Sequence, residues 1–306
     1  MIRAGLLALA LALTPALALA APSEVRRSES FMSRALGHEI NYAIYLPANI
    51  DAGAKLPVIY LLHGADGVGL DWVDQGHVQA VADRLIAEHR MPKTIIVMPD
   101  AHNSWYVDSP PSGMGAMGTA LERDLPDWVE QHYPARSART ARAVAGYSMG
   151  GFGAFDFAFG HPQRYVAVAA MSGAFWTWMK PDMQMDPARN GRFQRLFQGA
   201  FGDPFEPRRF WDNAPAQAVD HMAASGPHPA VLLICGRGDD FHLDQEQAEM
   251  QRRLEADHIP VETKLIDGGH DWGTWSAALP EVLEFLGRHL REPATASATL
   301  PKPGQQ

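Results

Sequence analysis

Short runs of consecutive apolar residues recur along the chain, and stretches with a different period separate them. The runs cover residues 40–46, 58–62, 94–98, 143–146, 165–171, 230–235 and 261–266. Between most of them, apolar residues return every three or four positions, as over 78–86, 125–129 and 279–286. Continuous apolar strands that alternate with amphipathic helices predict an α/β fold, with a mainly parallel sheet covered by helices on both faces.

One stretch, residues 175–220, interrupts this alternation. It is rich in aromatic residues, Met and Pro and contains no clear strand, so we expect an inserted, cap-like segment. Trp176 and Trp178 fit two roles equally well, plain core packing or the wall of an acyl pocket. Trp105 and Tyr106 follow the third apolar run, and we expect them to line the same pocket.

The two ends of the chain differ from the region between them. Arg3 precedes an uncharged stretch rich in Leu and Ala, and small residues stand before Ala21-Pro22. This pattern predicts a signal peptide over residues 1–20 and export to the periplasm or the medium. The alternative is an uncleaved membrane anchor, but the run is shorter than the roughly 20 residues that span a bilayer. We expect one catalytic domain over 23–292 and a disordered tail over 293–306.

Composition and charge narrow the function. An apolar fraction of 46% with eight tryptophans is enough for a packed core, and the net charge of −9 argues against a duplex nucleic-acid binder. A small neutral or apolar ligand fits better. The single cysteine, Cys235, lies in an apolar strand, so no intramolecular disulfide can form, and we expect a buried thiol.

Ser148 is the first candidate for catalytic chemistry. It lies in the sequence GYSMG directly after the apolar run 143–146, and Phe152, Phe155 and Phe159 follow at helical spacing. A G-x-S-x-G sequence between a strand and a helix is typical of a nucleophile elbow. There the serine takes a strained conformation, and its hydroxyl stands at the amino end of the helix.

A serine nucleophile needs a base, an acid that orients the base, and donors for the oxyanion. His270 lies in a glycine-rich loop after the last strand, and Asp239 and Asp240 both follow the strand before it. On residue order alone either aspartate can be the acid. The N–H groups of Met149, next to the nucleophile, and of Ala65, after the early strand 58–62, are the expected oxyanion donors.

The remaining motifs give weaker evidence about function. The sequence GMGAMG at 113–118 matches G-x-G-x-x-G, but it follows Pro110-Pro111-Ser112 instead of a strand, so we do not interpret it as a dinucleotide site. The His and Asp residues lack metal-ligand spacing. We therefore expect neither a metal nor a cofactor.

The motifs also occur together and in order. They are YLLHG at 60–64, VMPDA at 97–101, SWYVD at 104–108, AGYSMGGFGAF at 145–155, CGRGDDF at 235–241 and GGHDWGTW at 268–275. Over residues 30–290 the chain resembles the esterase D / tributyrin esterase group of α/β-hydrolases, whose relatives are S-formylglutathione hydrolases, feruloyl and acetyl-xylan esterases, and mycolyltransferases.

The resemblance implies an α/β-hydrolase fold with Ser148 as nucleophile, His270 as base, and Met149 and Ala65 as oxyanion donors. Its acid stands four residues after the Cys of a C-G-x-x-D pattern, which selects Asp239. Segment 175–220 is longer and richer in Trp and Met than this group implies. We expect a secreted serine esterase that acts on a small-molecule ester. The alternatives are an acyltransferase with the same triad and a non-catalytic binding module on a hydrolase fold.

Overall fold

The computed structural model describes residues 21–110, 113–222 and 226–290. The expected signal peptide over 1–20 and the expected tail over 293–306 lie outside these described residues. Among the helices of the described part, none is long and apolar enough to cross a membrane.

The centre of the fold is an eight-stranded sheet with the strand order β1-β2-β4-β3-β5-β6-β7-β8. β1 pairs antiparallel with β2, and β2 pairs antiparallel with β4. All other neighbours are parallel. The strands are β1 (Glu24–Met32), β2 (Glu39–Leu46), β3 (Val58–Leu62), β4 (Ile95–Pro99), β5 (Arg142–Tyr147), β6 (Ala167–Met171), β7 (Ala230–Gly236) and β8 (Val261–Ile266).

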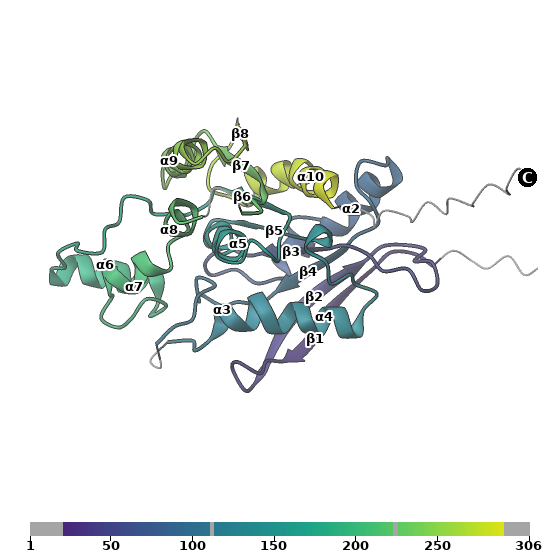
Figure 1. Cartoon of the computed structure of the whole chain (residues 1–306), viewed down its shortest axis with the longest axis horizontal. Coiled ribbons are helices and arrows are strands. Elements are labelled where there is room, and N and C mark those ends of the chain that lie inside the picture. Colours follow the sequence, from purple (N-terminus) through teal and green to yellow (C-terminus); the bar gives the residue numbers. More distant parts are fainter. Residues whose placement is uncertain (1–20, 111–112, 223–225, 291–306) are drawn as a thin grey trace, which may run out of the picture.

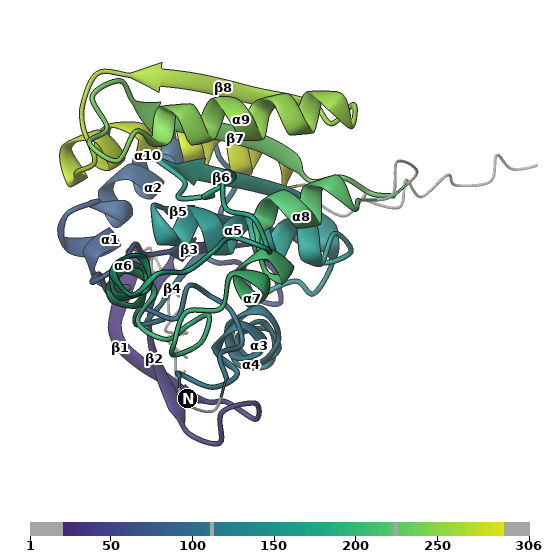
Figure 2. The ribbon, with the colours of Figure 1, turned by 90° about the vertical axis from the view of Figure 1, so that its left-hand side faces the viewer.

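Helices cover both faces of the sheet (Figures 1 and 2). α2 and α10 pack on one face, and α4, α5 and α9 pack on the other. The helices are α1 (Asp71–Asp74), α2 (Val78–Ala87), α3 (Met117–Thr119), α4 (Leu125–His132), α5 (Met149–Gly160), α6 (Pro187–Phe197), α7 (Pro207–Asp212), α8 (Pro215–Asp220), α9 (Leu243–Ala256) and α10 (Trp272–His289). A π-helical turn (Ala120–Asp124) precedes α4, and a 3-10 turn (Arg139–Ala141) precedes β5.

The buried strands separate two apolar cores. In β3, Ile59 and Leu61 pack toward α2 and α10, whereas Val58, Tyr60 and Leu62 pack toward α4 and α5. Successive residues of a strand point to opposite faces of the sheet. All five side chains are nevertheless buried, because helices cover both faces. This burial on both faces is why the central strands are continuous apolar runs in the sequence.

Each of the seven predicted strands is present, and the prediction of a mainly parallel sheet is confirmed. Several elements were not predicted, among them β1, α1, α3, α9 and the three helices of the segment 175–220. β1 is an edge strand in which exposed and half-buried residues predominate, so it has no apolar run. α9 has a mainly polar sequence that buries Leu243, Met250 and Leu254 among a few others.

The segment expected to form a cap contains α6, α7 and α8, and α6 and α7 project from the body of the molecule (Figure 1). Its own aromatic cluster holds it together. Phe197 lies within 5.4 Å, between ring centroids, of Phe201, Phe205 and Phe210. Trp105, from the loop after β4, packs 4.8 Å from Phe197 and so ties the cap to the sheet.

Candidate active site

Ser148 stands at a sharp corner between β5 and α5. Its backbone has φ 53° and ψ −118°, a left-handed conformation that costs a non-glycine residue energy and is characteristic of functional corners. Close packing around the corner requires glycine on both sides. A Cβ on Gly146 would lie 2.3 Å from the Gly150 carbonyl, and a Cβ on Gly150 would lie 2.2 Å from the Leu62 oxygen. The structure thus places Ser148 on the elbow expected from the sequence.

A continuous chain of hydrogen bonds runs from Ser148 to Asp239. His270 Nε2 lies 3.0 Å from Ser148 Oγ, and His270 Nδ1 lies 2.8 Å from Asp239 Oδ2. The three residues come from the loops after β5, β8 and β7, whose carboxyl ends meet at one edge of the parallel sheet. The His270 side chain is 12% exposed and that of Asp239 is fully buried. The sequence-predicted base and nucleophile are therefore brought within hydrogen-bonding distance.

The structure distinguishes the two aspartates that residue order leaves open. Asp239 is buried and its Oδ1 accepts the N–H of Phe241 at 3.0 Å. Burial by itself raises the pKa of the Asp239 carboxyl, but the hydrogen bonds from His270, Ser172 and Phe241 outweigh it and lower the pKa below its usual value. Asp240 is exposed and stands outside this network.

Backbone contacts hold the loops after β7 and β8 in register. The N–H of Arg237 donates to the Ile266 carbonyl at 2.8 Å, and the N–H of Gly238 donates to the Gly268 carbonyl at 2.9 Å. A side chain on Gly236 would collide with the Gly268 carbonyl at 2.6 Å. The loop that carries Asp239 is consequently attached to the loop that carries His270.

Two aromatic side chains fix the orientation of the imidazole. Phe241 and Trp275 each meet the His270 ring edge to face, at centroid distances of 4.7 and 5.0 Å. Both belong to motifs that the sequence analysis quoted, CGRGDDF and GGHDWGTW, but it assigned neither a role. Their position next to the base only becomes visible once the loops are folded.

The two residues whose N–H groups are expected to bind the oxyanion are Met149, next to Ser148 in sequence, and Ala65, in the loop after β3. The Met149 N–H belongs to the first turn of α5, where N–H groups lack intrahelical acceptors. Ala65 is exposed in the loop after β3, and a Cβ on the preceding residue, Gly64, would lie 3.3 Å from Ser148 Cβ. Ala65 lines the same cavity as Ser148, so both residues lie near the serine, and their role as oxyanion donors stays a prediction.

A buried histidine and a buried tyrosine form hydrogen bonds to the backbone of the loop after β3, which contains Ala65. His63 Nδ1 donates to the Gly64 carbonyl at 2.7 Å, while its Nε2 accepts the N–H of Ala101 at 2.9 Å. Burial lowers the pKa of His63, so the neutral form of the imidazole is favoured over the cation. Tyr106 donates from its hydroxyl to the His63 carbonyl at 2.9 Å.

Known proteins resemble this chain over most of its length. The sequence model of the family described as "Putative esterase" matches residues 33–286. The chain belongs to this family. An acetyl esterase of Caldicellulosiruptor saccharolyticus is 24% identical over 234 residues, which are 76% of this chain and 84% of the relative.

Solved structures agree with the family. A ferulic acid esterase has a TM-score of 0.73 and 27% identity, over 89% of this chain and 100% of that one. The fluorophosphonate-binding serine hydrolase FphF of Staphylococcus aureus has a TM-score of 0.68 and 20% identity, over 89% and 100% of the two chains. The α/β-hydrolase fold and the resemblance to the esterase D group are confirmed, and the protein is a carboxylic ester hydrolase.

A cavity of about 470 Å³ adjoins Ser148 in this esterase. Trp105 lines it, as the sequence analysis expected, and so does Trp176, for which core packing was the equal alternative. Tyr106 does not, because it is completely buried and its ring occupies the space beside Gly153 under the site. Trp178 does not line this cavity either; it is 49% exposed and borders a neighbouring one.

The cavity also contains residues that sequence reasoning missed. They come from α1, from the turn after it, from the cap and from the start of α10: Asp71, Gln75, Arg195, Leu196, Gln198 and Trp272. Trp272 lies in the quoted motif GGHDWGTW, but the sequence analysis gave it no role, and no motif marks the others. Among the described residues, no group of His, Cys, Asp or Glu is arranged to hold a metal ion.

Proposed function

We propose that this protein is an exported serine esterase in which Ser148, His270 and Asp239 form the catalytic triad. The observation that carries the proposal is the hydrogen-bonded chain Asp239–His270–Ser148, which ends at a serine with a strained backbone at the start of α5. Nucleophile, base and orienting acid are the three groups that acyl transfer through serine requires.

Each group has a defined step. His270 Nε2 takes the hydroxyl proton of Ser148 while Oγ attacks the ester carbonyl, and the Met149 and Ala65 N–H groups stabilise the oxyanion. His270 then protonates the departing alcohol, which leaves an ester bond between the acyl group and Ser148. Water attacks this acyl-enzyme with the same base, and the carboxylic acid is released. Asp239 keeps the proton of the neutral imidazole on Nδ1 and stabilises the imidazolium.

The comparisons support small or aryl acyl groups as substrates, because the relatives are an acetyl esterase and a ferulic acid esterase. The site agrees, since the 470 Å³ cavity with its Trp105 and Trp176 walls can hold an acyl group of either kind. p-Nitrophenyl acetate is therefore a suitable first substrate.

The test is the variant Ser148→Ala. Removal of the nucleophile should lower hydrolysis of p-nitrophenyl acetate by at least about 10³-fold, while the far-ultraviolet circular dichroism spectrum stays unchanged. Turnover within tenfold of the wild type would refute the assignment. A parallel assay with added alcohol separates an esterase from an acyltransferase, because an acyltransferase forms the new ester in preference to the acid.

Export rests on the sequence of residues 1–20 alone, with its Arg3, its apolar stretch and the small residues before Ala21. The experiment is expression of the full chain in a Gram-negative host, followed by fractionation and amino-terminal sequencing. A mature protein that begins at Ala21 in the periplasm supports export. A chain that keeps Met1 in the cytoplasm contradicts it.

A further inference from the structure

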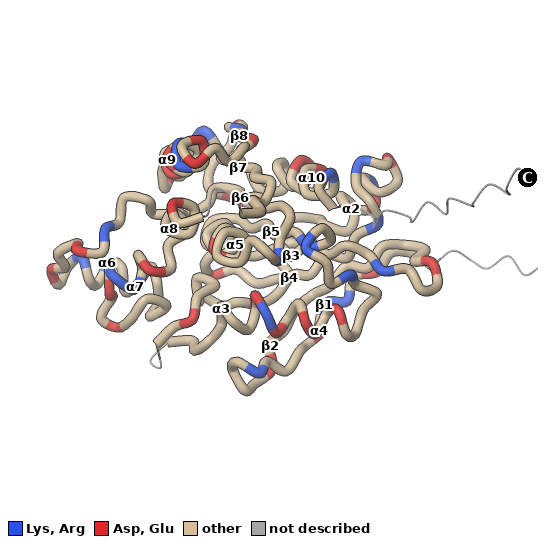
Figure 3. The backbone as a smooth tube through the Cα atoms, in the orientation of Figure 1, with Lys and Arg blue, Asp and Glu red and all other residues tan. Residues whose placement is uncertain are grey.

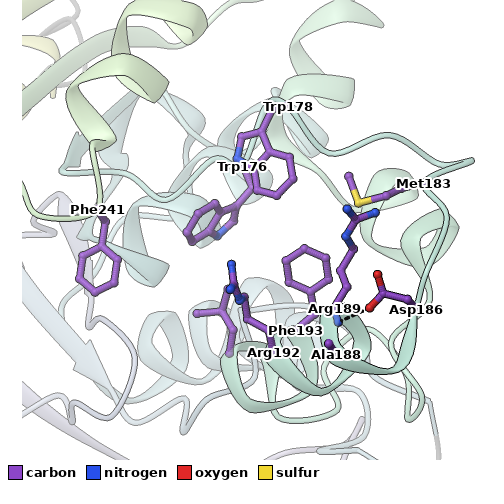
Figure 4. Close-up of a pocket in the computed structure, with 10 residues that line it drawn as sticks. Trp176, Trp178, Met183, Asp186, Ala188, Arg189, Arg192, Phe193 and Phe241 are labelled. Atoms are coloured by element: carbon purple, nitrogen blue, oxygen red, sulfur yellow. Dashed lines mark hydrogen bonds between the residues drawn. The ribbon is translucent and has the colours of Figure 1, made fainter.

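A second and larger cavity adjoins the one at Ser148. It has a volume of about 790 Å³ and lies against the cap (Figure 4). The two cavities share Trp176, Leu196 and Phe241 as lining residues. These three side chains are therefore the boundary that a substrate bound at Ser148 would pass to reach the second cavity.

The walls of this second cavity are aromatic and apolar. Trp176 and Trp178 stand on one side, Phe193 and Met183 on another, and Phe241 opposite (Figure 4). Trp178 and Phe241 are 49% and 58% exposed, although large apolar side chains are ordinarily covered in a monomer. A flat aromatic group of a ligand would cover both and stack between them.

Two arginines of α6 supply positive charge at the same place. Arg192 lines the second cavity and points into it toward Trp176 (Figure 4), while Arg195, one turn later, lines the cavity at Ser148. Residues three positions apart lie on one face of a helix. One arginine therefore faces each cavity, and Leu196 of the same helix lines both.

These two arginines differ from most others in the chain. Lys and Arg are scattered among Asp and Glu throughout the molecule (Figure 3), and many arginines form ion pairs, for example Arg34, Arg90 and Arg253. Within the part of the chain that the structure describes, Arg192 and Arg195 have no ion pair and no hydrogen bond. In a protein with a net charge of −9, two unpaired arginines beside the site are free to bind an anion of the ligand.

The acidic residues of the two cavities indicate where that anion can lie. Asp186 lies at the far end of the second cavity, where it caps α6 by accepting the Arg189 N–H at 2.8 Å. Asp66 and Asp71 border the Ser148 cavity but belong to the loop after β3 and to α1. An anionic group is repelled at both of these places and attracted between them, at Arg192 and Arg195.

We propose that the second cavity is a subsite for esters whose far end is an aromatic ring that carries a carboxylate. The ring stacks among Trp176, Trp178 and Phe241, and the carboxylate binds Arg192 and Arg195, whose planar guanidinium groups match its geometry. This inference rests on the proposed function, because it places the scissile ester at Ser148.

The experiment compares matched esters that differ only in charge. For the acyl half, they are p-nitrophenyl 3-(4-carboxyphenyl)propanoate and its 4-carbamoyl analogue. For the alcohol half, they are 4-(acetoxymethyl)benzoate and 4-(acetoxymethyl)benzamide, followed by acid release. In one of the two pairs we expect kcat/KM for the carboxylate to exceed that for the amide about tenfold, as for a hydrogen-bonded ion pair. Salt at 0.5 M should reduce this preference by screening.

Two variants and a control test which residues cause the preference for the carboxylate over the amide. In the double variant Arg192→Gln/Arg195→Gln, the ratio of carboxylate to amide should fall to about one. The control Arg208→Gln changes an arginine of α7 that is exposed and lines neither cavity, so the ratio should remain. Ala188→Trp, which fills the second cavity from α6, should lower kcat/KM for the aryl esters relative to p-nitrophenyl acetate.

The outcomes separate this inference from the proposed function. Equal rates for both members of both pairs, or a preference that survives the double variant, would overturn the subsite. Both results leave the esterase intact as long as p-nitrophenyl acetate is hydrolysed and Ser148→Ala abolishes it. If Ser148→Ala still hydrolyses both p-nitrophenyl acetate and the aryl esters, the proposed function itself is overturned.

Discussion

Replacement of Asp239 by Asn tests how the acid positions the base, and the structure allows the effect to be worked out atom by atom. The Asp239 carboxylate accepts the Phe241 N–H on Oδ1 and His270 Nδ1 on Oδ2, and the Cys235 thiol also donates to Oδ2 at 3.8 Å. An asparagine has only one oxygen. If that oxygen keeps the Phe241 N–H, the amide NH₂ faces His270 Nδ1 and donates to it.

That arrangement reverses the tautomer of His270. The proton then resides on Nε2, which can no longer accept the proton of Ser148. The opposite amide orientation keeps the proton on His270 Nδ1 but places the NH₂ against the Phe241 N–H, so a buried hydrogen bond is lost in that case. A serine hydrolase with the wrong tautomer loses about 10⁴-fold in kcat, which corresponds to about 5.4 kcal/mol of transition-state stabilisation.

The assay is hydrolysis of p-nitrophenyl acetate by Asp239→Asn and by the matched control Asp240→Asn, with thermal melting to show that both fold. Asp240 is exposed, so its variant should keep activity within about twofold of the wild type. A loss below tenfold in Asp239→Asn, or a larger loss in Asp240→Asn, would show that the hydrogen-bonded chain is not the catalytic one.

Three further outcomes follow from the structure. Gly150→Ala should lower the free energy of unfolding by about 1–3 kcal/mol, because its Cβ meets a β3 carbonyl at 2.2 Å; Gly160→Ala on the same helix, with its nearest atom at 4.0 Å, should not, and urea melts of the pair check this. Burial and two nearby carboxylates raise the pKa of Asp156 from 3.8 to about 7. The folded state therefore binds this proton more tightly than the unfolded state, and stability falls as the pH rises from about 4 to about 7. Asp156→Asn should remove that loss and stabilise the protein at pH 8 more than at pH 4, by a few kcal/mol; equal effects in thermal melts at both pH values would contradict it. Burial raises the pKa of Cys235 to about 12, so Ellman's reagent should find no thiol in the native protein and one after denaturation, whereas fast native reaction would show an open strand β7.

The strands and the candidate site residues could be predicted from the sequence because short local patterns mark each of them. A continuous apolar run as short as 58–62 is typical of a buried strand, and the corner at Ser148 is marked by glycines whose absence of a side chain is a steric requirement. Edge elements were harder to predict. β1 is half exposed, so it does not need the run of apolar residues from which a strand can be predicted.

The parts of the site that escaped prediction depend on distant contacts. Tyr106 and Trp105 are adjacent in sequence, yet one supports the His63 carbonyl from below and the other lines the cavity. Only the packed loops decide which side each ring takes. Arg192 and Arg195 carry no motif, and their relevance appears only when α6 is seen beside the cavity at Ser148.

The central claim is that Ser148 is the nucleophile activated by His270, and covalent labelling tests it most directly. The protein is incubated with a fluorophosphonate, and the mass of the intact chain and of its peptides is measured. The account predicts one added phosphonyl group, on the peptide that contains Ser148, and no labelling of Ser148→Ala. A label on another residue, or labelling that persists in Ser148→Ala, would contradict it.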